Sequence, residues 1–208
     1  MFSINQLKNT ETKYFFWIYY LLIVVFGTLQ IIYSPTELFL FVNSFVNNSA
    51  TIVFKLITWI GSGYAYALIC VALIIYNKWI GIATTSTFGL TSLVAQGIKN
   101  FIENIPRPLT YFQQQKIELL MPDSSEKLYW YSFPSGHTVS AFSMFCALAF
   151  VFKNKLISVL FILMALSVGV SRVYLTAHFV RDTYFGMIIG VELTCIVFYL
   201  FRFKLQKQ

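Results

Sequence analysis

The sequence predicts an all-α integral membrane protein, folded as one bundle of six transmembrane helices. Two observations carry this prediction. Of the 208 residues, 58% are hydrophobic and only 11% are charged, with a mean hydropathy of +0.70, whereas a soluble domain carries about 25% charged residues. Apolar runs close to the ~20 residues that cross a bilayer also recur along the chain. This composition excludes an ordinary soluble domain and a disordered chain.

The six expected spans are consecutive, and one long loop separates the third from the fourth. The first is too long for the apolar core of a secretory signal, so we expect it to remain as a helix. The second is interrupted by Gly61-Ser62-Gly63, and the third ends at Lys99. The spans cover about 14–33, 51–76, 79–98, 136–152, 156–174 and 183–201. Without a repeat or a second domain, residues 1–208 are expected to form a single membrane domain.

The distribution of charge orients the bundle. Six spans place both termini on one side, which then holds eight Lys or Arg residues against one Glu, while the other side holds seven basic and six acidic residues. Cytoplasmic loops are enriched in Lys and Arg. We therefore expect both termini in the cytoplasm and the segment 99–135 outside. The net charge of +7 is then a consequence of topology and does not indicate a nucleic acid partner.

Three groups of polar residues lie at span ends on the expected outer side, where polar side chains are costly and mark function. The first group is Lys99 with Arg107-Pro108. Pro106 and Pro108 restrict the backbone on both sides of Arg107. Taken alone, this stretch is better explained as a basic helix end followed by a loop.

The second group is Ser132–Thr138, directly before the fourth span. Ser135 is expected to cap the helix, and Gly136 allows a ligand to approach the backbone. The free N–H groups and the dipole of a helix start bind anions, and His137 lies above that position. The alternative is a simple N-cap with an interfacial histidine.

The third group is Ser171-Arg172, His178 and Asp182. His178 and Asp182 are four residues apart and would share one face of a helix. The carboxylate would fix the imidazole tautomer and leave the other nitrogen free to attack, while Arg172 suits phosphate oxygens. An isolated histidine and aspartate at this spacing more often have a structural role than a catalytic one. Together, however, the three groups provide the cations, nucleophile and acid that phosphoryl transfer requires.

The chain resembles the type 2 phosphatidic acid phosphatase (PAP2) superfamily of membrane lipid phosphatases. That family's pattern is Lys-x6-Arg-Pro, then Pro-Ser-Gly-His, then Ser-Arg-x5-His-x3-Asp. The second and third motifs are complete here, at 134–137 and 171–182. The first departs by one residue, because seven residues separate Lys99 from Arg107 and Asn100 occupies the usual lysine position.

The resemblance implies hydrolysis through a phosphohistidine, with no metal and no cofactor. His178 would attack phosphorus, Asp182 would orient His178, and His137 would protonate the leaving oxygen and then activate water. The residues implied to bind the phosphate are Lys99, Arg107, Ser135, Gly136 and Arg172. The sequence also shows no carboxylate cluster suited to a divalent ion.

The resemblance further implies an enzyme of the bacterial inner membrane, with its site facing the periplasm or exterior. Its partners would be a membrane lipid phosphate and the bilayer, with the oligomeric state left open. Undecaprenyl diphosphate is the preferred substrate, and phosphatidylglycerol phosphate and lipid A are alternatives. A lipid-phosphate transporter or channel is a further hypothesis, because Glu192 lies within the sixth span. A non-catalytic lipid phosphate binder is another.

Two features of the long loop leave alternatives open. Tyr129, Trp130 and Tyr131 precede the second motif and are interpreted as interfacial anchors, although they could equally line a lipid entry gap. The segment 109–131 could form a lid or a loose loop.

Overall fold

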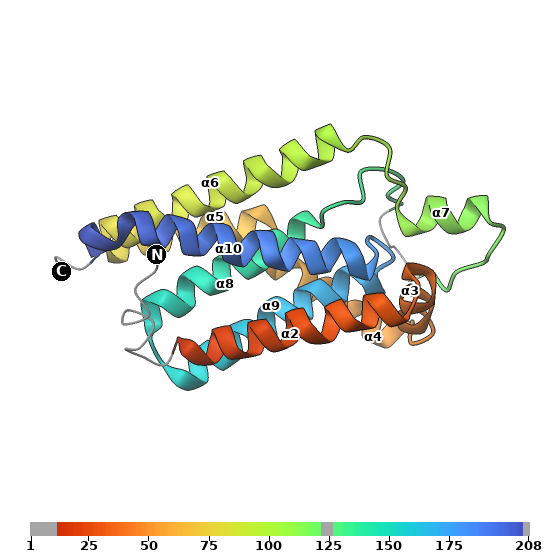
Figure 1. Ribbon diagram of the computed structural model, residues 1–208, viewed down its shortest axis with the longest axis horizontal. Helices are drawn as coiled ribbons and strands as arrows, with labels where there is room; N and C mark the ends of the chain where they lie inside the picture. Colours follow the sequence, from red (N-terminus) through yellow and green to blue (C-terminus); the bar gives the residue numbers. More distant parts are fainter. Residues whose placement is uncertain (1–11, 122–126, 206–208) are drawn as a thin grey trace.

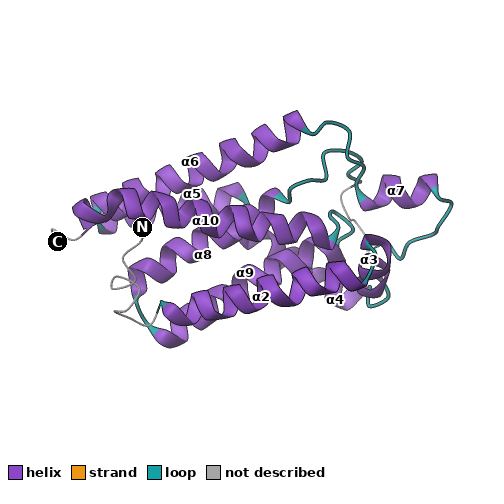
Figure 2. Ribbon diagram, in the orientation of Figure 1, coloured by secondary structure: helices purple, strands orange, loops and turns teal. Residues whose placement is uncertain are grey.

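The computed structural model describes residues 12–121 and 127–205, and these ranges contain only helices and loops (Figure 2). The expected charge asymmetry draws partly on residues outside these ranges, among them Lys8, Glu11 and Lys207. Long helices lie side by side along one axis, and α2 begins and α10 ends toward the same end of the bundle (Figure 1).

The described helices agree with most of the expected spans. They are α2 (Lys13–Ile32), α3 (Pro35–Asn43), α4 (Asn48–Ile60), α5 (Gly63–Tyr76), α6 (Lys78–Phe101), α7 (Pro108–Gln114), α8 (Gly136–Phe152), α9 (Lys155–Tyr174) and α10 (Val180–Leu205). The expected second span is divided between α4 and α5. The helices α3 and α7 were not predicted.

Three of the described helices are long and apolar enough to cross a membrane, namely α2, α9 and residues Val180–Arg202 of α10. A fourth span results if α3 and α4, which are bent by 116° at their break, count as one. The helices α5 and α8 are apolar but shorter, and α6 carries four Thr and two Ser residues. The structure therefore supports a membrane bundle, while six spans remain a prediction.

Close approach of α10 to α8 fixes the relative position of the second and third motifs. A Cβ atom added at Gly190 would lie 2.7 Å from the carbonyl oxygen of Val139, and one added at Gly186 would lie 3.0 Å from that of Ser135. Small residues allow membrane helices to pack this closely. The helix α8, which is mostly buried, also packs against α9 and α6, so its first turn is held from several sides.

The break between α4 and α5 packs against this same first turn. Ser62 caps α5, because its hydroxyl accepts a hydrogen bond from the Ala65 N–H (3.2 Å). A Cβ atom added at Gly61 would lie 2.5 Å from Val168 and 2.8 Å from the carbonyl oxygen of His137. The break between α4 and α5 therefore lies directly against the backbone of His137. A side chain at position 61 would prevent this close contact.

Candidate active site

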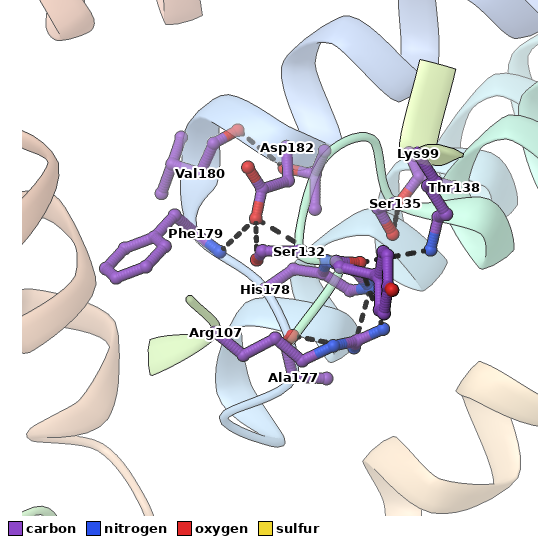
Figure 3. A network of polar contacts seen from close by, with 12 residues as sticks. Lys99, Arg107, Ser132, Ser135, Thr138, Ala177, His178, Phe179, Val180 and Asp182 are labelled. Atoms are coloured by element: carbon purple, nitrogen blue, oxygen red, sulfur yellow. Dashed lines mark hydrogen bonds and ion pairs between the residues drawn. The ribbon is translucent and has the colours of Figure 1, made fainter. Parts of the chain in front are cut away.

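His178 lies between a carboxylate and a guanidinium (Figure 3). Its Nδ1 is 3.5 Å from Asp182 Oδ2, and its Nε2 is 3.3 Å from Arg107 Nη1. The prediction that His178 and Asp182 share one helical face is wrong, because α10 begins at Val180 and His178 lies in the loop before it. The two side chains lie close together because Asp182, in the first turn of α10, directs its carboxylate toward the loop that carries His178.

Hydrogen bonds of Asp182 connect the third motif to the second motif and to the residues just before it. Its Oδ2 accepts hydrogen bonds from Ser132 Oγ (2.5 Å) and from the Phe179 N–H (3.0 Å), and its carbonyl oxygen accepts one from the Ser135 N–H (3.1 Å). Ser132 and Asp182 are both fully buried. The bond to Asp182 was not anticipated for Ser132, whose position just before the Pro-Ser-Gly-His motif was the only signal in the sequence.

Backbone carbonyl groups hold the Arg107 side chain. Its Nε donates to the Trp130 carbonyl (2.7 Å), Nη1 to the Ala177 carbonyl (3.0 Å) and Nη2 to the Tyr131 carbonyl (3.4 Å). The Arg107 N–H also donates to the Tyr129 carbonyl (2.9 Å). The side chains of residues 129–131 are about half exposed. This stretch therefore positions a cation with its backbone, a role that its aromatic residue types do not indicate.

The lysine of the first motif reaches the site despite the longer spacing. Lys99 Nζ donates to the Tyr131 carbonyl (3.3 Å), the same group that Arg107 contacts, and Lys99 borders a cavity together with His137. Asn100 is exposed, is absent from the lining of this cavity and accepts a hydrogen bond from Gln96 Nε2 (2.9 Å). Lys99, not Asn100, therefore lies beside His137.

The start of α8 presents backbone N–H groups that no side chain caps. Ser135 occupies the N-cap position, but the prediction that its side chain caps the helix is wrong, because its Oγ accepts a hydrogen bond from Thr138 Oγ1 (2.9 Å) instead. A Cβ atom added at Gly136 would meet nothing within 4 Å, so the backbone there is open. Uncapped N–H groups and the helix dipole together favour an anion at this point.

Arg172 holds the loop that carries His178. Its carbonyl oxygen accepts hydrogen bonds from the N–H groups of Ala177 (3.0 Å) and His178 (3.2 Å). Its Nη1 donates to Thr58 Oγ1 in α4 (2.9 Å). Arg172 therefore combines a buried positive charge with a backbone role that fixes the position of the imidazole.

The surroundings of His178 keep its ring neutral. Burial lowers the pKa of the imidazole to about 3; the nearby Asp182 opposes this shift, and the positive charges of Arg107 and Arg172 reinforce it. A neutral ring with its proton on Nδ1, toward Asp182, has a lone pair on Nε2, the state in which imidazole acts as a nucleophile. Within residues 12–121 and 127–205, no three His, Cys, Asp or Glu residues are grouped to hold a metal ion.

The site combines a buried histidine held between Asp182 and Arg107 with a cavity lined by His137, Lys99 and the open start of α8. These are the kinds of group that phosphoryl transfer requires. The sequence pattern of the PAP2 superfamily matches residues 78–206, and the chain belongs to this superfamily. The predicted membership is thus confirmed.

Three curated relatives are phosphatases of different lipids. Phosphatidylglycerophosphatase B of Bacillus subtilis is 30% identical over 159 residues, covering 72% of this chain and 68% of the relative. Undecaprenyl-diphosphatase BcrC of the same organism is 27% identical over 144 residues, covering 67% of this chain and 70% of the relative. Lipid A 1-phosphatase of Rhizobium johnstonii is 32% identical over 127 residues, covering 60% and 50%.

Two solved structures share the fold. Aquifex aeolicus LpxE has a TM-score of 0.70 at 26% identity, covering 79% of this chain and 94% of that one. A transmembrane PAP2 type phosphatidylglycerolphosphate phosphatase from Bacillus subtilis has a TM-score of 0.63 at 23% identity, covering 90% and 94%. The chain is accordingly a membrane phosphatase, similar to bacterial lipid phosphatases.

Proposed function

We propose that this protein is a metal-independent lipid phosphate phosphatase that works through a phosphohistidine. The contact of His178 with Asp182 on one ring nitrogen and with Arg107 on the other carries the proposal. In the first step, His178 Nε2 forms a bond to phosphorus while the bond from phosphorus to the leaving oxygen breaks. Asp182 orients the ring and balances the positive charge that it gains.

His137 acts in both steps. It gives its proton to the leaving oxygen in the first step and takes a proton from water in the second, when water attacks phosphorus and releases phosphate and His178. Charge developing on the phosphoryl oxygens is stabilised by Lys99, Arg107, Arg172, Ser135 and the Gly136 N–H.

Undecaprenyl diphosphate remains the preferred substrate, followed by phosphatidylglycerol phosphate and lipid A. Each of these lipids corresponds to the name of one of the three relatives described above. We place the enzyme in the bacterial cytoplasmic membrane as one six-span domain over residues 1–208. Its termini would lie in the cytoplasm and its site would face the periplasm or exterior.

The alternative hypotheses receive less support. Glu192, the residue that suggested transport, accepts a hydrogen bond from Tyr19 Oη (2.8 Å), so it has a structural partner within the bundle. A binder without turnover would not need the buried pairing of His178 with Asp182.

Phosphate release by the purified protein in detergent tests the proposal. The panel is undecaprenyl diphosphate, phosphatidylglycerol phosphate, phosphatidate and lipid A, each with and without EDTA. We expect release from at least one lipid, undiminished by EDTA, and its loss in His178→Ala and His137→Ala. Wild-type turnover in both variants would contradict the mechanism, and loss of activity with EDTA would contradict metal independence.

A further inference from the structure

A cluster of buried aromatic rings lies beside the loop that carries His178. Phe179 contacts Phe39 of α3 (ring centroids 5.6 Å apart) and Phe112 of α7 (6.2 Å), and these two rings contact each other (5.1 Å). Phe39 and Phe112 are fully buried, and Phe179 is nearly so. The cluster therefore joins three segments that are far apart in the sequence, and α3 and α7 lie at the same end of the bundle (Figure 1).

One side of this cluster is connected to Asp182 through the backbone of Phe179. The Phe179 N–H donates to Asp182 Oδ2 (3.0 Å), and the same oxygen lies 3.5 Å from His178 Nδ1. The Phe179 ring points away from these polar contacts (Figure 3). Because the ring and the N–H belong to one residue, a displacement of the ring also displaces a donor that holds the Asp182 carboxylate.

The other side of the cluster is connected to Arg107. The helix α7 begins directly after Arg107, which is its N-cap residue, and the Tyr111 N–H donates to the Arg107 carbonyl (2.9 Å). The Tyr111 ring packs edge-on against Phe179 (centroids 5.5 Å apart, 89° between the planes). Arg107 Nη1 in turn lies 3.3 Å from His178 Nε2. The cluster therefore links the two groups that contact opposite nitrogens of the imidazole.

Asn43 provides a second attachment of α3 to the same part of the chain. It is the last residue of α3, and it is buried. Its Nδ2 donates to the Leu120 carbonyl (2.9 Å), and its Oδ1 accepts a hydrogen bond from the Leu120 N–H (3.1 Å). The segment 108–121 is accordingly held against α3 by a buried pair of rings and by two hydrogen bonds.

We propose that Phe39 and Asn43 are positioning residues for the nucleophile. By holding α7 and the loop before α10 together, α3 keeps Arg107 and Asp182 on the two nitrogens of the His178 ring. This inference rests on the proposed function, because it concerns the same imidazole. Since the two residues act through other groups and not on the lipid, their loss should slow the chemical step and leave lipid binding largely unchanged.

Steady-state phosphate release tests the ring contact with Phe39→Leu, which removes the ring but keeps an apolar side chain. We expect kcat to fall by roughly three- to tenfold, the value of one aromatic pair, with KM changed less than about twofold. Phe15→Leu is the matched control, because Phe15 in α2 is also fully buried and contacts a neighbouring ring, that of Phe16 (5.7 Å). It removes the same atoms from the core of the bundle and should keep the wild-type kcat.

A second pair of variants tests the hydrogen-bonded attachment. Asn43→Ala removes both bonds to Leu120 and should also lower kcat by roughly three- to tenfold. Asn154→Ala is its control, because the Asn154 side chain likewise binds a backbone N–H, that of Ile157 (3.2 Å), at the start of α9. It should keep the wild-type kcat. If Phe39→Leu fails to fold, this pair decides.

Combination with Ser132→Ala tests whether the effect passes through Asp182, because Ser132 Oγ donates to the same carboxylate oxygen. Changes that act on one group are not independent. We therefore expect the double variant Phe39→Leu/Ser132→Ala to lose less kcat than the product of the two single losses. A merely destabilised core would give losses that multiply.

The inference is overturned if a folded Phe39→Leu or Asn43→Ala variant keeps the kcat of its control or changes only KM, or if the losses in the double variant multiply. A folded wild type that releases phosphate from none of the lipids in the panel would instead refute the proposed function, so the two failures are distinguishable.

Discussion

The hydrogen bond from Ser132 to Asp182 offers a sharp test of how the nucleophile is positioned. Asp182 Oδ2 accepts hydrogen bonds from Ser132 Oγ (2.5 Å) and the Phe179 N–H (3.0 Å), and lies 3.5 Å from His178 Nδ1. Ser132→Ala removes one of these two donors and leaves the residues of the reaction in place. With only the Phe179 N–H remaining, the carboxylate can turn away from the imidazole.

The magnitude follows from the kind of bond that is lost. A hydrogen bond to a charged group contributes about 1.5–3 kcal/mol, and each ~1.4 kcal/mol of transition-state stabilisation is tenfold in rate. Because Asp182 acts through His178 and does not contact the lipid, the loss should fall on kcat. We expect kcat to fall by roughly ten- to hundredfold, with KM changed less than about threefold.

Steady-state phosphate release with the preferred lipid measures this effect. Ser158→Ala is the matched control, because Ser158 is also fully buried and its hydroxyl has no hydrogen-bond partner among the described residues. It should keep wild-type kinetics. Wild-type kcat in a folded Ser132→Ala variant would refute the reasoning, as would a change confined to KM.

Four further predictions concern other parts of the protein. The chain has two histidines, so His137→Gln leaves a single imidazole for NMR titration. We expect the His178 signal to stay that of a neutral ring at pH 5, and a midpoint near 6.5 would contradict its burial. Because the pKa of His178 is lowered on folding, the free energy of unfolding should decrease as pH falls from about 6.5 toward 3. Lys99→Met should lower kcat/KM at least about tenfold for every lipid hydrolysed, and an unchanged value would remove Lys99 from the site. Gly61→Ala should destabilise the protein by ~1–3 kcal/mol, whereas Gly97→Ala, where a Cβ atom would meet nothing within 4 Å, should not; equal melting temperatures would contradict the packing described.

The sequence motifs select the residues proposed for the site but do not give their geometry. The two histidines, Asp182, Arg107 and Arg172 have the spacing of a known family, whereas Lys99 is one residue further from Arg107 than the family pattern requires. The spacing of His178 and Asp182 suggested a helical pair, however, and the structure instead uses a loop and the first turn of α10. A spacing of four residues is compatible with both arrangements, so only the position of the helix start distinguishes them.

Contacts made by the backbone could not be predicted at all. The carbonyl groups of Trp130 and Tyr131 bind the side chains of Arg107 and Lys99, yet every residue has a carbonyl group, so no residue type marks this role. The break at Gly61 was visible in the sequence, but its contact with the His137 carbonyl depends on the packing of α4 against its neighbours. The six spans also remain a prediction, because α6 is polar and α5 and α8 are short.

Trapping the covalent intermediate tests the central claim most directly. A lipid labelled with ³²P in its terminal phosphate is mixed with the His137→Ala variant, in which water is poorly activated, and with the wild type, and both are quenched in alkali, where phosphohistidine is stable. We predict label on His178 in the wild type and none in His178→Ala. In His137→Ala the label should form more slowly, because the leaving oxygen lacks its proton donor, and once formed it should also be hydrolysed more slowly. Turnover of the lipid without label on His178, or with label on another residue, would contradict the account.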